Sequence, residues 1–437
     1  MKPTQHSLTV INRDCLLYCL LVVNSFPLFS FMATSGHNGA LLDPSGNAAW
    51  QIFWALAFLD ATFITISFRV PLHKIVFAIA PFMLFILLLM LSTSWSEHPD
   101  LTIRRGIREC AELTTVIFLA LTFSNSQRLL RILFGSFLCI MCLDFLSIAS
   151  PAFSFTSIGF AGVHGHKSPA GEFYFLAIPI FLMATIDYRI AGSRLVGLIA
   201  TVPAFVFLLL TRSKSAVSLL ILTVLAMLLL KVAYSARKYI IPVTLVFLLF
   251  VLIAVAVIWT IGIPETLDLT YGDPTLTNRS LIWRYIFARY ETSPTWGVGY
   301  GALWQIGPEV ESYMTELGFG WVMVNEGHNG YLDILAQLGL VGLLFFLVFL
   351  GIYLARILLM LKTADWPNLA VYSAYVVIGG IGYNFTESSY FKPGELLWLL
   401  TVLTTTTAAA NSTYLWRRSR LWRRSRTGLH PVRLTPT

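Results

Sequence analysis

Long apolar runs separated by short polar segments dominate the chain up to about residue 412. Most of these runs hold about 17 to 23 residues, the length a helix needs to cross the hydrocarbon core of a membrane. Lipid offers backbone groups no hydrogen-bond partner, so such runs predict helices. We expect about twelve spans, near residues 14–32, 48–66, 73–92, 109–124, 129–150, 170–187, 194–211, 214–232, 240–262, 331–355, 368–385 and 395–412.

The pattern predicts an all-α, polytopic integral membrane protein. Residues 1–412 form its transmembrane domain, with a large polar loop at 263–330, and residues 413–437 form a basic tail. Composition agrees, because 57% of residues are hydrophobic and 12% are charged, with a mean hydropathy of +0.74; soluble proteins carry about 25% charged residues. The first run also fits the apolar region of a signal peptide, but its length favours a retained span.

The five cysteines lie within or at the edges of apolar runs, which argues against a disulfide framework. Cys139 and Cys142 have the spacing of a redox motif. Their position inside an apolar run favours their interpretation as packed or lipid-facing side chains.

Basic residues predict the orientation. Twenty of the 30 lysines and arginines fall on the side of the N-terminus, seven of them in the tail. The positive-inside rule therefore places both termini in the cytoplasm. The segments expected outside are 33–47, 93–108, 151–169, 212–213, 263–330 and 386–394.

The tail contains a tandem hexapeptide, Leu-Trp-Arg-Arg-Ser-Arg, at 415–420 and again at 421–426. Tryptophan at headgroup level and arginine against anionic lipid make a membrane anchor at this position. Nucleic-acid binding is the alternative for such a basic repeat, and the adjoining span disfavours it.

Several outside cations stand where cations are disfavoured, at helix N-termini, which are the positive ends of helix dipoles. We interpret the set as a site for an anionic ligand, with phosphate held by free backbone amides and neighbouring cations. The alternative for each lysine alone is an anchor reaching to lipid headgroups. The residues concerned are Lys167, Lys214, His328 and Lys392.

The polar loop is predicted to contain an amphipathic helix at residues 279–290, lying on the membrane surface. Arg279 continues its apolar stripe, whereas Arg284 points to the opposite face. An arginine where the apolar face meets lipid headgroups suits bidentate binding of a lipid diphosphate. Simple anchoring of the helix by Arg279 is the alternative.

A glycine-rich aromatic turn follows at 296–304, and sugar stacking and interfacial tryptophan explain it equally well. His328, beside Glu326 and Asn329, fits a general base or a hydrogen-bond donor to a phosphate or a sugar hydroxyl. Metal binding is disfavoured, because it needs several ligands at suitable spacing and His164 with His166 is the only other pair of histidines expected outside.

Asp60 and Asp144 are the charged residues deepest in apolar runs. If they paired across helices, they would mark a proton path. Hydrogen-bonded packing residues are the favoured interpretation.

Together, these motifs resemble the O-antigen ligase and polymerase superfamily of bacterial envelope proteins, particularly its exopolysaccharide polymerases. The strongest part is the run from His328 through Leu332, followed by the run from Gln337 to Gly342. The other similar pieces are Trp95-Ser-Glu-His-Pro99 with Arg104-Arg105, Gly165-His-Lys-Ser168, Ser213-Lys-Ser-Ala216, Asn278-Arg-Ser-Leu-Ile-Trp283 and Asn384-Phe-Thr-Glu387-Ser388.

The resemblance implies a metal-independent glycosyltransferase without a cofactor, acting on undecaprenyl-diphosphate-linked oligosaccharides at the outer face of the bacterial inner membrane. The family's cationic pair and histidine fall on Lys214, Arg279 and His328. Lys214 stands where ligases commonly have arginine, which suits the exopolysaccharide branch. Membrane lipid, chain-length regulators and export proteins are the expected partners, and nucleic acid is not.

As a hypothesis, Lys214 and Arg279, helped by Arg212 or Arg284, stabilise the diphosphate leaving group. His328, or failing that Glu326 or Glu387, accepts the proton of the attacking hydroxyl. Substrate contacts are expected for Arg212, Arg284, Lys167, Asn329, Glu326, Glu387 and Lys392. Ligation to a lipid A core is one alternative function. A flippase or transporter is another, although such proteins usually carry charge near the bilayer midplane and repeated halves.

Overall fold

The computed structural model describes residues 5–25, 48–235, 279–304, 326–361 and 368–411. Helices make up nearly all of this part, so the all-α prediction is confirmed. The longer helices are α1 (Gln5–Ser25), α3 (Ala48–Ser67), α6 (Pro99–Thr122), α7 (Ser126–Ser147), α9 (Lys167–Ile186), α11 (Arg194–Leu210), α12 (Lys214–Ser235), α15 (Arg279–Thr292), α17 (Gly330–Leu361), α18 (Asn368–Tyr383) and α19 (Leu396–Asn411). The shorter elements are α4 (Leu72–Ile79), α5 (Met83–Leu91), η2 (Ser92–Ser94), α8 (Pro151–Ser154), η3 (Gly162–His164), α10 (Tyr188–Ala191) and a two-stranded antiparallel ribbon of β1 (Phe155–Thr156) and β2 (Gly159–Phe160).

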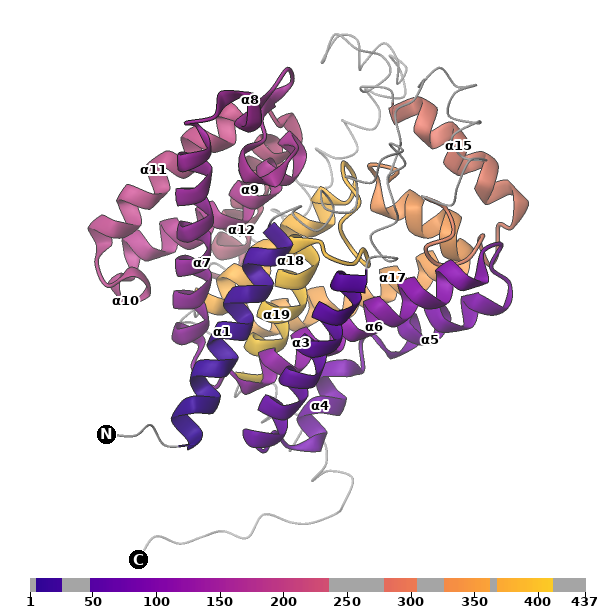
Figure 1. Cartoon of the computed structure of the whole chain (residues 1–437), viewed down its shortest axis with the longest axis horizontal. Helices are drawn as coiled ribbons and strands as arrows, with labels where there is room; N and C mark the ends of the chain where they lie inside the picture. The colour runs from indigo at the N-terminus through magenta and orange to yellow at the C-terminus, as the bar shows by residue number, and fades with distance from the viewer. Residues whose placement is uncertain (1–4, 26–47, 236–278, 305–325, 362–367, 412–437) are drawn as a thin grey trace, which may run out of the picture.

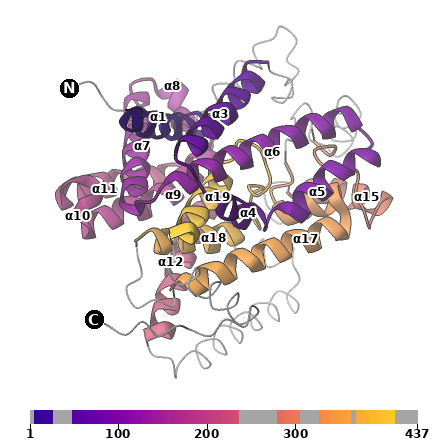
Figure 2. The ribbon, with the colours of Figure 1, turned by 90° about the horizontal axis from the view of Figure 1, so that it is seen from below.

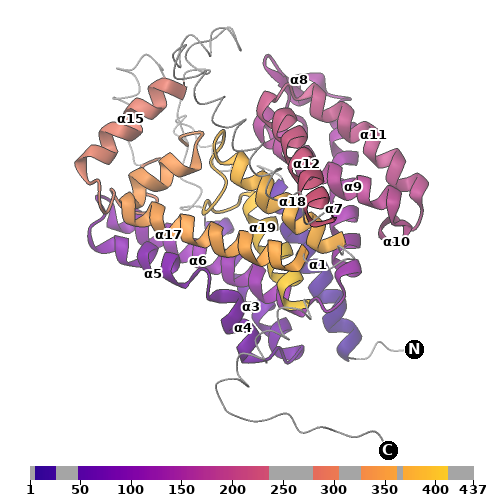
Figure 3. The same cartoon turned by 180° about the vertical axis from the view of Figure 1, so that it is seen from behind.

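Two central helices, α18 and α19, separate the remaining helices into two groups. In Figure 1, α7 and α9 to α12 lie on one side of this pair, and α3, α5, α6, α17 and α15 lie on the other. The views from below and from behind show the same order (Figures 2 and 3).

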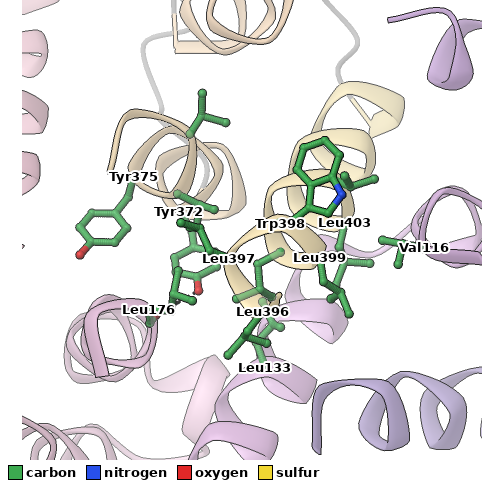
Figure 4. Packing of buried hydrophobic residues seen from close by; sticks show 14 of the residues in the cluster. Val116, Leu133, Leu176, Tyr372, Tyr375, Leu396, Leu397, Trp398, Leu399 and Leu403 are labelled. Atoms are coloured by element: carbon green, nitrogen blue, oxygen red, sulfur yellow. Dashed lines mark hydrogen bonds between the residues drawn. The ribbon is translucent and has the colours of Figure 1, made fainter. Parts of the chain in front are cut away.

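The core forms around α19 because this helix is apolar or hydroxylated on every side, which is typical of a helix buried all round. Its residues from Leu396 to Ala410 are all buried. Threonines fit this setting by bonding to their own helix, as Thr401 Oγ1 does to Leu397 O at 2.8 Å. Side chains from four other helices meet those of α19 in Figure 4, namely Val116, Leu133, Leu176, Tyr372 and Tyr375.

Helices lie at eleven of the twelve predicted spans, and the twelfth span, at 240–262, lies outside the described residues. Within the described part, five helices are long and apolar enough to cross a membrane, or six if α4 and α5, bent by 63°, form one broken span. Four further apolar helices are shorter, among them α18 and α19 with 16 residues each. A helix of 16 residues is only about 24 Å long, so the count of twelve stays a prediction.

Two helices begin before the spans predicted there. α1 begins at Gln5, before the expected start of the span at 14, and α6 begins at Pro99, inside the segment 93–108 that is expected outside. Proline is favoured in the first helical turn, and Asp100 suits the positive end of the dipole. The low apolar content of this amphipathic stretch hid the start of α6, because hydropathy detects lipid contact and not helix formation.

The start of α1, the end of α6 and the end of α19 lie together. Arg13 Nη1 donates to Thr122 O at 3.1 Å, and Asn411 Nδ2 donates to Phe123 O at 2.8 Å. The Arg13 guanidinium also lies over the Phe68 ring at the end of α3. These ends carry several of the basic residues expected in the cytoplasm. The site described next lies at the opposite ends of α9 and α19.

A break in α17 connects this helix to the glycine-rich turn at 296–304. Gly339 has φ 66° and ψ −165°, a conformation open to glycine, and a Cβ there would collide with Thr295. The turn satisfies the four backbone groups that the break releases, as a lipid environment requires. The bonds are Leu340 N to Pro294 O (2.9 Å), Val341 N to Thr295 O (3.3 Å), Val298 N to Ala336 O (3.0 Å) and Gly299 N to Gln337 O (2.9 Å).

Candidate active site

Asp333 holds the turn that carries His328. Its buried carboxylate accepts hydrogen bonds from Gly327 N at 3.0 Å, Trp304 Nε1 at 2.9 Å and Ser388 Oγ at 2.5 Å. Three segments therefore meet on one side chain. His328 itself has φ 47°, a left-handed conformation that costs a non-glycine residue on the order of 1–3 kcal/mol. Packing around Asp333 maintains this strained conformation.

Asn329 and Asn384 join the start of α17 to the loop after α18. Asn329 Oδ1 caps α17 by accepting from Tyr331 N at 3.1 Å and Leu332 N at 3.2 Å. Gly330 N donates to Asn384 O at 2.9 Å, and a Cβ on Gly330 would collide with Asn384 Oδ1. This close backbone contact brings the His328 turn against the loop that begins at Asn384.

A chain of alternating charges results. Arg279 Nη2 donates to Glu387 Oε1 at 3.0 Å, and His328 Nδ1 lies 2.7 Å from Glu387 Oε2 and 3.1 Å from Glu326 Oε1. Lys392 forms an ion pair with Glu326. The Glu387 side chain is only 7% exposed, so one buried carboxylate links the first residue of α15 to the entrance of α17.

Burial and charge set the protonation states of this chain. Burial disfavours the imidazolium of His328, but hydrogen bonds to Glu326 and Glu387 and their charges outweigh it and raise its pKa to about 9. Burial likewise opposes the ionisation of Glu326, yet the charges of Lys392 and His328 lower its pKa. His328 is therefore a cation at neutral pH, and a general base there requires its deprotonated minority form.

His166 differs from His328. Burial, together with the charge of Lys167, lowers the pKa of His166, and its Nδ1 accepts a hydrogen bond from Ser168 N at 3.3 Å at the start of α9. The charges of Glu387, His328 and Glu326 also act on the pKa of His166. His166 and His328 therefore differ in charge at neutral pH.

The start of α19 and the start of α12 both lie close to α9. Glu172 joins α9 to α19, because its Oε1 accepts from Leu397 N at 3.0 Å, and its Oε2 accepts from Ser389 Oγ at 3.2 Å. A Cβ on Gly171 would lie 2.8 Å from Ser213 Cβ, so α9 and the start of α12 are also in close contact. The two lysines that begin these helices are Lys167, half-buried, and Lys214, exposed.

The remaining predicted site residues lie farther along these elements. Arg212 is exposed, with φ 54°, just before α12, and Arg284 is exposed on the outer face of α15. Asn329 serves as the cap of α17, and Lys392 lies 2.7 Å from Glu395 Oε1 in addition to its pair with Glu326. The substrate contacts expected for these residues stay predictions.

The predicted helix at 279–290 exists as α15, but its apolar face packs against protein. Ile282 and Ile286 are buried with Tyr285 against the turn at 296–304 and α17, while Phe287 stays 45% exposed. The helix pattern identified an apolar face without showing what covers it. Packing on α17 fixes the start of α15 and with it Arg279.

The glycine-rich turn is mainly a structural connection. Tyr300 and Trp304 are buried, Tyr300 OH donates to Phe391 O at 3.0 Å, and Arg105 Nη1 donates to Trp304 O at 2.8 Å. Trp296 is 48% exposed, and Trp95 Nε1 donates to its carbonyl at 3.1 Å. Buried rings cannot stack on a sugar, so stacking is left to Trp296.

Asp60 and Asp144 bond to different partners. Asn12 Nδ2 donates to Asp60 Oδ1 at 2.6 Å. Asp144 accepts from Tyr174 OH at 2.6 Å and lies 3.1 Å from His164 Nε2. Both carboxylates are satisfied locally, which agrees with the packing interpretation.

Sequence reasoning missed three residues that build the site. Asp333 fixes the His328 turn, Glu395 extends the charge chain, and His166 has a pKa on which the charges of that chain act. Each lies in or next to one of the motifs named above. A single acidic residue or histidine beside an apolar run does not indicate whether the residue supports the fold or binds a ligand. The tail, the span at 240–262, Asn278 and the rest of the large loop lie outside the described residues.

Glu326, His328 and Glu387 also form the described group whose ligand atoms, all within 4.8 Å of one another, fit a metal ion. A divalent cation there would have to replace the proton on His328 Nδ1 and compete with Arg279 and Lys392 for the carboxylates. Arg279 and Lys392 already neutralise those carboxylates without a metal ion. Metal independence stays a prediction with its own test.

Two comparisons with known proteins bear on this site. Residues 199–347 match the model of a family described as O-antigen ligase, a range that includes Lys214, Arg279 and His328. The chain is also 25% identical over 267 residues to the exopolysaccharide production protein ExoQ of Rhizobium meliloti (strain 1021). That match covers 57% of this chain and 58% of the relative, so the chain spans little more than half of the relative's length. Both findings confirm the resemblance to the O-antigen ligase and polymerase superfamily.

Proposed function

We propose that this protein is a glycosyltransferase that joins undecaprenyl-diphosphate-linked oligosaccharide repeats into exopolysaccharide or O-antigen at the periplasmic face of the inner membrane. The observation that carries the proposal is the charge chain from Arg279 through Glu387 and His328 to Glu326 and Lys392. The family match over residues 199–347, a range that includes Arg279, Glu326 and His328, supports it.

The chemistry follows from charge. Breaking the bond between the anomeric carbon and the diphosphate leaves negative charge on the phosphate oxygens, and preorganised cations in a site with little water stabilise it strongly. Arg279 offers a planar donor fork, and the charged imidazole of His328 adds a second donor. Lys214 and Lys167, at the starts of neighbouring helices, supply further positive charge, with Arg212 or Arg284 beyond them. Both termini lie in the cytoplasm in this scheme.

Ligation of polymer to a lipid A core uses the same chemistry, and the family model that matches this chain is described as O-antigen ligase. The two reactions differ in the acceptor only. Deleting the gene separates them, because loss of a polymerase leaves single repeats on the carrier lipid, whereas loss of a ligase leaves full-length polymer on it.

A flippase is the candidate from another class of protein. The charged groups of the described site lie at the ends of α15, α17 and α19 and not at their middles, which disfavours a transport path through the bilayer. Chain-length regulators and export proteins are proposed as partners in the envelope. Accumulation of single periplasmic repeats in the deletion strain supports the polymerase, and repeats retained in the cytoplasmic leaflet would contradict it.

A further inference from the structure

The two oxygens of Glu387 have different partners, and this difference suggests a role beyond charge balance. Oε1 accepts from Arg279 Nη2 at 3.0 Å, and Oε2 faces His328 Nδ1 at 2.7 Å. Glu387 is thus the one described carboxylate between the two cations assigned to the diphosphate. An incoming diphosphate competes with Oε1 for the same guanidinium.

Its backbone position is fixed while this exchange takes place. Glu387 N donates to Tyr383 O at 2.9 Å, and Glu387 O accepts from Gly330 N at 3.3 Å. Arg279, in contrast, is the first residue of α15 and reaches Glu387 with a long, flexible side chain. When a phosphate takes the guanidinium, the arginine therefore moves and the carboxylate stays.

We propose, on the premise of the function above, that Glu387 is the proton acceptor of the transfer and that the donor diphosphate unmasks it by taking Arg279. In the substrate-free site, Glu387 Oε1 accepts a hydrogen bond from Arg279. Once Arg279 turns to the diphosphate, Oε1 is free beside the reacting anomeric carbon, and His328 still holds Oε2 in place.

The step balances as follows. The acceptor hydroxyl gives its proton to Glu387 Oε1, its oxygen forms the new bond to the anomeric carbon, and the bond from that carbon to the phosphate oxygen breaks. The electron pair of the broken bond leaves with the diphosphate, which Arg279 and His328 hold. The protonated Glu387 then releases its proton to water, and Arg279 returns to it when the lipid diphosphate departs.

The alternatives within the chain are weaker. His328 carries its proton on Nδ1 between two carboxylates, and it donates where a base must accept. Glu326 is bound to Lys392 as well as His328, so its oxygens remain engaged after Arg279 moves. Loss of Arg279 to the diphosphate removes one of the two stabilising partners from Glu387 alone, which makes it the better base.

The test uses the full-length protein purified in detergent, with lipid-linked repeats from the deletion strain as donor and acceptor. We expect Glu387→Gln to bind undecaprenyl diphosphate at least as tightly as the wild type while turnover falls on the order of 10²- to 10⁴-fold. Glu387→Ala is expected to recover part of its turnover with added formate, which a purely structural role would not produce. Glu291→Gln, an exposed change on α15, is the control.

Turnover of Glu387→Gln close to that of the wild type would overturn this inference and leave the proposed function intact. Loss of undecaprenyl diphosphate binding in Glu387→Gln, without formate rescue of Glu387→Ala, would also overturn it by assigning Glu387 a structural role. A wild-type protein that neither binds undecaprenyl diphosphate nor forms polymer would reject the proposed function itself.

Discussion

Arg279 reaches Glu387 across 108 residues of sequence with a guanidinium-to-carboxylate distance of 3.0 Å. The pair unites the start of α15 with the loop after α18 at the entrance of α17. A guanidinium that donates to one carboxylate oxygen can exchange it for phosphate, because its planar fork matches the paired oxygens of a phosphate group.

Substituting Arg279 should therefore abolish polymer formation while the protein still inserts in the membrane. We expect Arg279→Ala to lower turnover on the order of 10²- to 10³-fold, because a donor to the developing charge is lost. Arg279→Lys should restore only part of it, since lysine lacks the planar fork. Polymer length on gels, normalised to the amount of protein in membranes, measures the effect.

Arg194→Ala is the matched control, an exposed arginine at the start of α11. It should leave polymer unchanged. Wild-type polymer from Arg279→Ala would remove Arg279 from the mechanism.

The pH profile tests the charge on His328. Its folded-state pKa of about 9 lies above the usual value of a histidine, so the imidazolium and its contribution to stability and diphosphate binding are complete at low pH and are lost as pH rises through about 9. Glu326 stays ionised across this range because the charges of Lys392 and His328 lower its pKa against burial, Lys392 keeps its charge because Glu326 and Glu395 raise its pKa, and His166 is already neutral because its pKa is lowered. Turnover should therefore decline above about pH 9.

His328→Gln should be weakly active and should lack this alkaline decline. An activity that instead increases as pH passes 9 would show that His328 acts as a base in its neutral form, as the sequence hypothesis has it.

The sequence and the structure agree where contact with lipid alone determines the secondary structure. Apolar runs of membrane length locate α3, α7, α9, α11, α12, α18 and α19 within a few residues, because burying backbone in lipid leaves helix as the solution. Helix-start cations such as Lys167 and Lys214 could also be predicted, because dipole direction follows from helix direction. The charge pattern could not show that Glu387 pairs with His328 and Arg279, since pairs 59 and 108 residues apart depend on tertiary packing.

The start of α6 and the break at Gly339 were beyond the sequence for other reasons. α6 begins in a stretch of mixed polarity, where helix formation depends on contacts with neighbouring helices. Gly339 lies in a run of apolar residues that continues a regular helix on hydropathy alone. Only the bonds to the turn at 296–304 explain the break.

Gly339→Ala should destabilise the site. A Cβ at Gly339 collides with Thr295, and a left-handed alanine adds about 1–2 kcal/mol. We expect a lower midpoint of thermal unfolding in detergent and less polymer. Gly351→Ala, in the same helix with nothing within 4 Å of its added Cβ, is the control and should unfold at the wild-type temperature or slightly above it. Equal midpoints for the two variants would contradict the role given to the break.

Chelation should leave turnover unchanged. Arg279 and Lys392 neutralise Glu387 and Glu326 in the described site, so leaving-group charge is stabilised by side chains. Turnover in EDTA, followed by dialysis and addition of Mg²⁺, Mn²⁺ or Zn²⁺ singly, measures this. Loss in EDTA that one of these ions restores would assign the Glu326, His328 and Glu387 group to a metal.

The most direct measurement is turnover by the purified protein in detergent, with lipid-linked repeats as the only substrates and no membrane gradient. Our proposal predicts longer lipid-linked oligosaccharides together with an equivalent release of undecaprenyl diphosphate, both absent with Arg279→Ala. Repeats that remain unchanged under conditions where the wild-type protein is folded, or that are consumed equally by Arg279→Ala, would contradict it.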